Sequence, residues 1–164
     1  MKRWIFGLLI LVAALQVHAW VPQPQVVYYG QAVDQYGWPI QSGAVVVLKG
    51  DGVEVDRHEI TGSISPGVNF SLTVLVSDNS DPQNYVENAV EVGSPVTLTL
   101  LRNGEEQPLF GVGAIPSVPA AGSLVYVGLT SGTDSDGDGI PDEWEWDLIW
   151  NSGGQLQTLA DVTK

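Results

Sequence analysis

The residues whose spacing most directly indicates a chemistry are acidic and lie near the C-terminal end. Between residues 134 and 145, carboxylates stand at positions 1, 3, 5, 9 and 12 of a twelve-residue segment, with glycine at position 6. Oxygen ligands at alternating positions let a short loop wrap around one hard cation. Glycine permits the sharp turn that such wrapping requires. The segment therefore predicts a metal site.

The spacing also assigns an atom to each position of this loop. The predicted ligands are Asp134, Asp136, Asp138, the backbone carbonyl of Ile140, Asp142 and Glu145. Asp142 is expected to act through a water, and Glu145 with both of its oxygens. Zinc is disfavoured because the chain has no cysteine and only two histidines. Magnesium demands stricter octahedral geometry and keeps its waters, so Ca²⁺ is the expected cofactor.

Charge repulsion makes the loop dependent on that ion. The four carboxylates at positions 134, 136, 138 and 145 would repel by roughly 1 kcal/mol per pair at about 4 Å, even at the dielectric of water. A divalent cation reverses the sign of this balance. We therefore expect calcium to order the segment.

A helix is predicted directly after the loop, over residues 141–151. Pro141 suits a first helical turn, and Gly153 and Gly154 stand just beyond the predicted end. Three tryptophans lie on this short helix, at positions 144, 146 and 150. We expect them to be buried against the rest of the chain or against a partner.

The loop sequence DSDGDGIPDEWE fits the EF-hand loop pattern, but residues 128–133 are too rich in glycine for the incoming helix of an EF-hand. The segment instead resembles a thrombospondin type 3-like repeat of secreted proteins. The resemblance implies calcium held by Asp134, Asp136, Asp138, Asp142 and Glu145. A second aspartate-rich segment often follows in such families, whereas 164 − 145 = 19 residues follow here. Either this copy stands alone or the chain is a piece of a longer one.

Residues 26–130 show the pattern of an all-β domain. Short apolar or alternating runs are separated by turn residues, as at Gly50-Asp51-Gly52 and Asn103-Gly104. The predicted strands are 26–33, 43–49, 53–60, 68–76, 86–91, 96–102, 107–112 and 124–130. Even-numbered residues from Val68 to Val76 should face the core, and odd-numbered ones from Asn69 to Leu75 should face away. We expect an antiparallel β-sandwich of seven to eight strands with a short C-terminal calcium loop and helix.

The opening of this domain carries a second resemblance. The segment YGQAVDQYGWPI at residues 29–40, followed by GAVVVL at residues 43–48, is similar to the start of transthyretin-like, or carboxypeptidase-regulatory-like, sandwich modules of secreted bacterial proteins. The resemblance implies a compact antiparallel sandwich that spaces or binds other modules, usually without catalysis.

The N-terminal sequence has the pattern of a secretory signal peptide, which predicts export. Lys2 and Arg3 precede an apolar run that is too short to cross a bilayer, and cleavage is expected after Ala19. The expected organisation is a signal peptide over 1–19, a leader over 20–25, the β domain over 26–130 and the calcium loop and helix over 131–164. Localisation is then secreted, periplasmic or at the cell surface.

The negative net charge of the chain disfavours partners that are themselves anionic. The formal net charge of −13 becomes −15 without Lys2 and Arg3, which disfavours nucleic acid and anionic membranes. No membrane span is expected after signal cleavage. Calcium and a protein or glycan partner are the expected partners.

Catalysis is not expected. His58 lies in a predicted strand, where it is read as a surface residue, and no cysteine nucleophile or Gly-x-Ser-x-Gly motif occurs. Calcium binding in a structural or adhesive surface protein is therefore the predicted function. One alternative is a carbohydrate- or peptide-binding module using Tyr36 and Trp38, from the Tyr/Trp cluster near residues 28–38. Another is a calcium-dependent docking module that uses the tryptophan helix.

Overall fold

The computed structural model describes residues 24–77, 88–111 and 117–162. The predicted signal peptide, most of the leader and residues 86–87 and 112 of two predicted strands lie outside them. The strands are β1 (Gln25–Val33), β2 (Ala44–Gly50), β3 (Val53–Ile60), β4 (Phe70–Ser77), β5 (Val90–Glu91), β6 (Val96–Arg102), β7 (Glu105–Gly111) and β8 (Leu124–Ser131). The C-terminal part forms helix α2 (Asp142–Asn151) and the 3₁₀ turn η2 (Leu159–Asp161).

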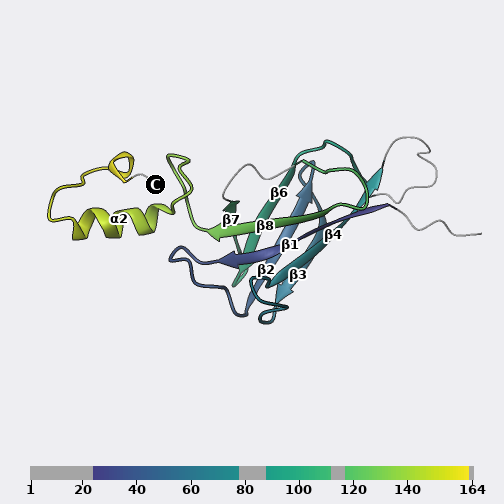
Figure 1. Cartoon of the computed structure of the whole chain (residues 1–164), viewed down its shortest axis with the longest axis horizontal. Helices are drawn as coiled ribbons and strands as arrows, with labels where there is room; N and C mark the ends of the chain where they lie inside the picture. Colours follow the sequence, from purple (N-terminus) through teal and green to yellow (C-terminus); the bar gives the residue numbers. More distant parts are fainter. Residues whose placement is uncertain (1–23, 78–87, 112–116, 163–164) are drawn as a thin grey trace, which may run out of the picture.

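The chain is all-β with a short C-terminal helix, as the sequence predicted. The eight strands form one sheet in the order β3-β2-β6-β7-β8-β1-β4-β5 (Figure 1). The arrangement differs from the expected sandwich in two ways. The sheet is continuous and curled, so two separate facing sheets are not clearly formed. It is also mixed, because β1 pairs in parallel with β8, and β4 in parallel with β5.

The curl brings strands from distant places in the sheet order together. β3 contacts β4, and the Thr73 backbone N–H donates a hydrogen bond of 2.6 Å to Oδ2 of Asp56. The β2–β3 register shifts between Leu48 and Lys49, and such a bulge bends a strand and changes the direction of its side chains. The Asp56 side chain thus joins β3 to β4, which are not paired with each other in the sheet.

Both hairpin turns foreseen in the sequence are present. β2 and β3 are joined by Asp51 and Gly52, with φ of 50° and 81°, and β6 and β7 by Asn103 and Gly104, with φ of 52° and 84°. Positive φ at both central residues gives the turn twist that matches right-twisted strands. These two hairpin pairings could therefore be predicted from the turn residues.

The core lies inside the curl. Its buried apolar residues are Val26, Tyr28, Ala32, Ile40, Ala44, Val46, Leu48, Ile60, Phe70, Leu72, Val74, Val76, Val90, Val96, Leu98, Leu100, Leu109, Val118, Val127 and Leu129. The alternation predicted for β4 is confirmed from Phe70 to Val76, while Val68 is half-buried. Burial also raises the pKa of Tyr28 to about 12.

Asn69 departs from the predicted alternation. It was expected to face away from the core, but it is buried. Its side chain accepts the Ala32 N–H at 2.7 Å and donates to the carbonyls of Ala32 and Ile40, each at 2.9 Å. A buried amide with these bonds satisfied costs little. It ties the start of β4 to the end of β1 and to the segment that follows β1.

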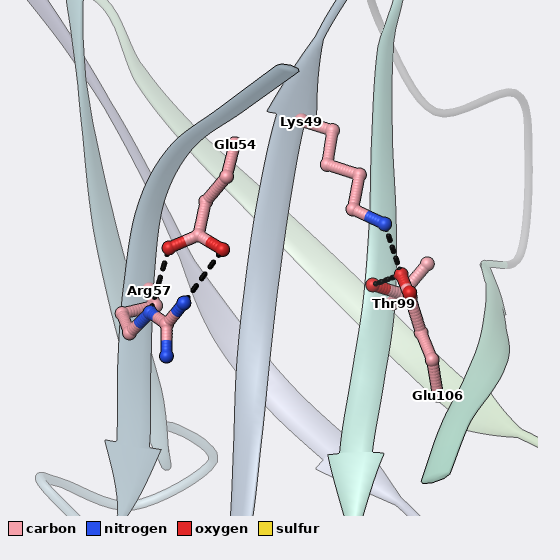
Figure 2. A network of polar contacts seen from close by, with 5 residues as sticks. All are labelled: Lys49, Glu54, Arg57, Thr99 and Glu106. Carbon is pink, nitrogen blue, oxygen red and sulfur yellow. Dashed lines mark hydrogen bonds and ion pairs between the residues drawn. The ribbon is translucent and has the colours of Figure 1, made fainter. Parts of the chain in front are cut away.

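Pairs of polar side chains lie on the outer surface of the sheet (Figure 2). Lys49 contacts Glu106, which also accepts a hydrogen bond of 2.7 Å from Thr99, and Arg57 pairs with Glu54 at 2.6 Å and 2.7 Å. Exposed pairs of this kind contribute about 0–1 kcal/mol each. Within the described ranges, no ion pair reaches an acid of residues 134–147.

Gly30 allows β1 to lie close to β8, which leads into the acidic segment. A Cβ at Gly30 would lie 1.9 Å from the Val127 carbonyl oxygen, whereas one at Gly128 would meet nothing within 4 Å. We expect Gly30→Ala to lower the free energy of unfolding by about 1–3 kcal/mol or more, because backbone atoms must move. Gly128→Ala, the matched control on β8, should change it by about 0.5 kcal/mol or less. Urea denaturation measures both, and equal effects would contradict the close-approach role.

Candidate metal centre

The acidic loop lies between β8 and α2, at the end of the molecule from which α2 projects (Figure 1). Its turn is held by its own side chains. The Asp134 carboxylate accepts the N–H groups of Gly137 at 2.8 Å and Gly139 at 3.0 Å. Oδ1 of Asp138 accepts the Ile140 N–H at 2.8 Å. Gly137 and Gly139 have φ of 78° and 89°, which side chains rarely permit.

This folding brings three predicted ligands together. One carboxylate oxygen from each of Asp134, Asp136 and Asp138 lies within 4.8 Å of the other two. Oxygens that share a calcium ion lie about 2.3–2.6 Å from it, so two of them can be about 5 Å apart. The cluster could therefore hold a metal ion.

Glu145 does not belong to this group of three, but the charges of the aspartates act on its carboxyl. Its side chain is 0 % exposed, although it sits on a ten-residue surface helix. Side chains on a helix lean toward its N-terminus, which here is the end at the loop. Neither Glu145 oxygen has a hydrogen-bond partner in the described part of the chain, nor does Oδ2 of Asp138.

The electrostatics of Glu145 are unfavourable without a cation. Burial raises the pKa of its carboxyl, and the negative charges of Asp136, Asp138, Asp142 and Asp134 raise this pKa further. A raised pKa means that the folded loop penalises the ionised form. Buried charges are normally paired or coordinate a metal, and the described residues supply no such pairing here. A cation between Glu145 and the aspartates would remove the penalty.

The other two predicted ligands, Asp142 and Ile140, do not belong to the group of three aspartates. Both carboxylate oxygens of Asp142 accept hydrogen bonds from Ser135, from its N–H at 2.7 Å and its hydroxyl at 2.6 Å. The Asp142 N–H donates to the Thr133 carbonyl at 2.8 Å. Asp142 therefore closes the base of the loop, a positioning role that ligand spacing alone did not reveal. Ile140 has a buried side chain, and the role of its carbonyl stays a prediction.

Helix α2 begins and ends within one residue of the predicted 141–151 range. The expectation that its tryptophans are buried against the β domain is wrong. Trp146 is 52 % exposed, Trp150 is 88 % exposed and Trp144 is also exposed. The reason is that α2 projects away from the sheet (Figure 1), so that no strand covers it.

Tyr36 and Trp38 lie on a tight loop after β1. Oδ1 of Asp34 accepts the N–H groups of Tyr36 at 3.0 Å and Trp38 at 2.9 Å. Their side chains are 52 % and 72 % exposed. Elsewhere in the predicted cluster, Tyr28 is buried, and Tyr29 packs edge-on against Tyr126 with ring centroids 5.6 Å apart. Tyr126 was not foreseen, because it comes from a strand distant in sequence.

This aromatic loop lies beside the base of the acidic segment. A Cβ at Gly132 would lie 3.7 Å from Cβ of Gln35, 3.5 Å from Cβ of Pro141 and 3.2 Å from Oε2 of Glu143. The junction between β8 and the acidic loop thus contacts both the loop after β1 and the first turn of α2.

Comparisons with known proteins give no family for the chain. No protein-family model, curated protein or solved structure matches it significantly. No helix in the described residues is long and apolar enough to span a membrane.

The buried carboxylate gives a prediction for metal-free protein. With divalent cations removed by a chelator, Glu145→Gln should stabilise α2 by about 1–3 kcal/mol, because a neutral amide is cheaper to bury than an unpaired carboxylate. Hydrogen exchange of the α2 amides measures this. Glu143→Gln, an exposed acid on the same helix, is the matched control and should change protection little. Equal protection in Glu145→Gln and the wild type would show that Glu145 carries no unpaired charge.

Proposed function

We propose that residues 134–145 bind one calcium ion, and that this ion orders the C-terminal segment of an exported structural or adhesive surface protein. The observation that carries the proposal is Glu145. A fully buried carboxylate without a hydrogen-bond partner stands among four aspartates, and a bound cation accounts for that arrangement.

The donor set favours calcium over other metals. The cluster offers oxygen atoms, from Asp134, Asp136, Asp138 and both oxygens of Glu145. Together with the Ile140 carbonyl and a water, these would make about seven ligands, within the usual range for calcium. Extracellular calcium modules bind at about 10⁻⁴–10⁻³ M, and we expect the same range here.

Calcium binding would fix the start of α2. Pro141 precedes the helix without a side-chain cap, and the first turn carries Asp142, Glu143 and Glu145. Glu145 would bind the ion together with aspartates from before the helix. The ion would therefore hold the first turn of α2 to the loop, and through Ser131 and Gly132 to the end of β8.

The export part of the proposal rests on the sequence. The apolar N-terminal run and the acidic balance suit a secreted, periplasmic or surface protein. The resemblances to thrombospondin type 3-like repeats and to transthyretin-like modules support the same class. A calcium site of submillimolar affinity is also suited to an extracellular module.

Calorimetric titration with calcium tests the proposal directly. The wild type should bind one ion, and α2 amides should gain protection. Asp136→Asn and Glu145→Gln should each weaken binding at least about tenfold, because each removes a charged ligand. Glu143→Gln should bind as the wild type does.

The effect of Glu145→Gln on the stability of α2 should also reverse when calcium is added. Without metal, α2 should be more stable in Glu145→Gln than in the wild type. In saturating calcium, α2 should be less stable in Glu145→Gln than in the wild type. Absence of calcium-dependent heat in the wild type would overturn the proposal.

A second candidate function is binding of a carbohydrate or peptide at Tyr36 and Trp38. The favouring observation is their exposure on a loop whose backbone is hydrogen-bonded to Asp34, since a preorganised aromatic surface loses little entropy on binding.

A glycan array tests this second candidate. Binding that falls at least about tenfold in Trp38→Ala and persists in Trp146→Ala, an equally drastic change on α2, would support it. The same binding in both variants would exclude the Tyr36 and Trp38 surface.

A further inference from the structure

The two sides of helix α2 have different chemistry. Successive residues turn by about 100°, so that Asp142, Glu145 and Ile149 share one side, and all three are buried or half-buried. The adjoining side of the helix carries Glu143, Trp146, Asp147 and Trp150, all of them exposed. We call these four residues the outer face. Apart from Glu143, whose Oε2 lies close to Gly132, these side chains are not covered by any described element of the chain.

The outer face alternates indoles with carboxylates. Glu143 and Trp146 are three residues apart, as are Asp147 and Trp150, and residues at this spacing are neighbours on a helix surface. The second pair follows the first by four residues, which is about 6 Å along the helix axis. At this spacing the carboxylate of each pair can approach the indole of the same pair. A cation can therefore contact both members of a pair at once.

Charge decides which partner fits this face. The chain has a net charge of −13 with six basic residues. In the structure Lys49 and Arg57 are paired on the sheet, and no basic residue lies in the last turn of α2. A second copy of the chain, a nucleic acid or an anionic membrane would be repelled. A cationic polypeptide is the complementary partner.

We propose that the outer face of α2 docks a polypeptide segment that presents two arginine side chains about 6 Å apart, as residues i and i+4 of a helix do. A guanidinium is planar, so it can stack on an indole while it donates hydrogen bonds to the neighbouring carboxylate. This inference rests on the proposed function, because calcium at Glu145 holds the inner side of α2 and thereby presents the outer face.

The test uses the full mature chain in saturating calcium and a synthetic alanine-based helix carrying two arginines four residues apart. Binding is followed by NMR through the indole N–H signals of Trp146 and Trp150. We expect these two signals to shift, and affinity to fall about tenfold in Trp146→Ala/Trp150→Ala, because two cation–aromatic contacts are lost. The charge-neutral pair Glu143→Gln/Asp147→Asn should weaken binding to a similar extent. Trp144→Ala, on the flank of the helix, should bind as the wild type does.

A peptide of identical composition with its arginines two residues apart separates docking from general attraction. On a helix those arginines point about 200° apart, so only one can reach the face, and affinity should fall at least about fivefold. Equal binding of the two peptides, or unchanged binding in the Trp146→Ala/Trp150→Ala variant, would overturn the inference.

Calorimetry on the same proteins separates the two proposals. Wild-type protein that binds calcium but shows no shift at Trp146 or Trp150 would reject docking alone. Protein that shows no calcium-dependent heat would reject the proposed function, and a peptide shift in that protein would still support docking.

Discussion

The unpaired charge of Glu145 is the constraint on which the C-terminal segment depends. Its carboxylate is fully buried without a hydrogen-bond partner, beside a cluster of three aspartates whose oxygens lie within 4.8 Å of one another. Desolvation and like charge both oppose ionisation there. Two outcomes relieve the conflict: a proton on Glu145 or a cation among the oxygens. At neutral pH a divalent cation relieves all four carboxylates together, whereas a proton relieves one.

The β sheet supplies the fixed end of this arrangement. β8 leads directly into the acidic loop and lies in parallel beside β1, with Gly30 packed against the Val127 carbonyl. The loop that follows β1 is anchored by Asn69 and Asp34 and reaches Gly132. The base of the acidic loop is therefore held by well-packed structure, and α2 projects beyond it. A bound ion would extend this order from the sheet into the helix.

Local patterns predicted local structure well. Asp51-Gly52 and Asn103-Gly104 gave their hairpins because positive φ restricts the residue choice, and the limits of α2 followed from Pro141 and the glycines at 153–154. The gathering of Asp134, Asp136 and Asp138 followed from spacing in the same way. Features that depend on distant residues were missed: the parallel pairing of β1 with β8, the burial of Asn69 and the pairing of Asp142 with Ser135. The exposure of the α2 tryptophans in this chain was not predicted, because their apolar character suggested burial against the β domain or against a partner.

A crystal structure of the protein grown in millimolar calcium tests the central claim most directly. We predict an ion among Asp134, Asp136 and Asp138, with both oxygens of Glu145 about 2.3–2.6 Å from it. A structure in which Glu145 is turned toward solvent, with no ion between it and the aspartates, would contradict the claim.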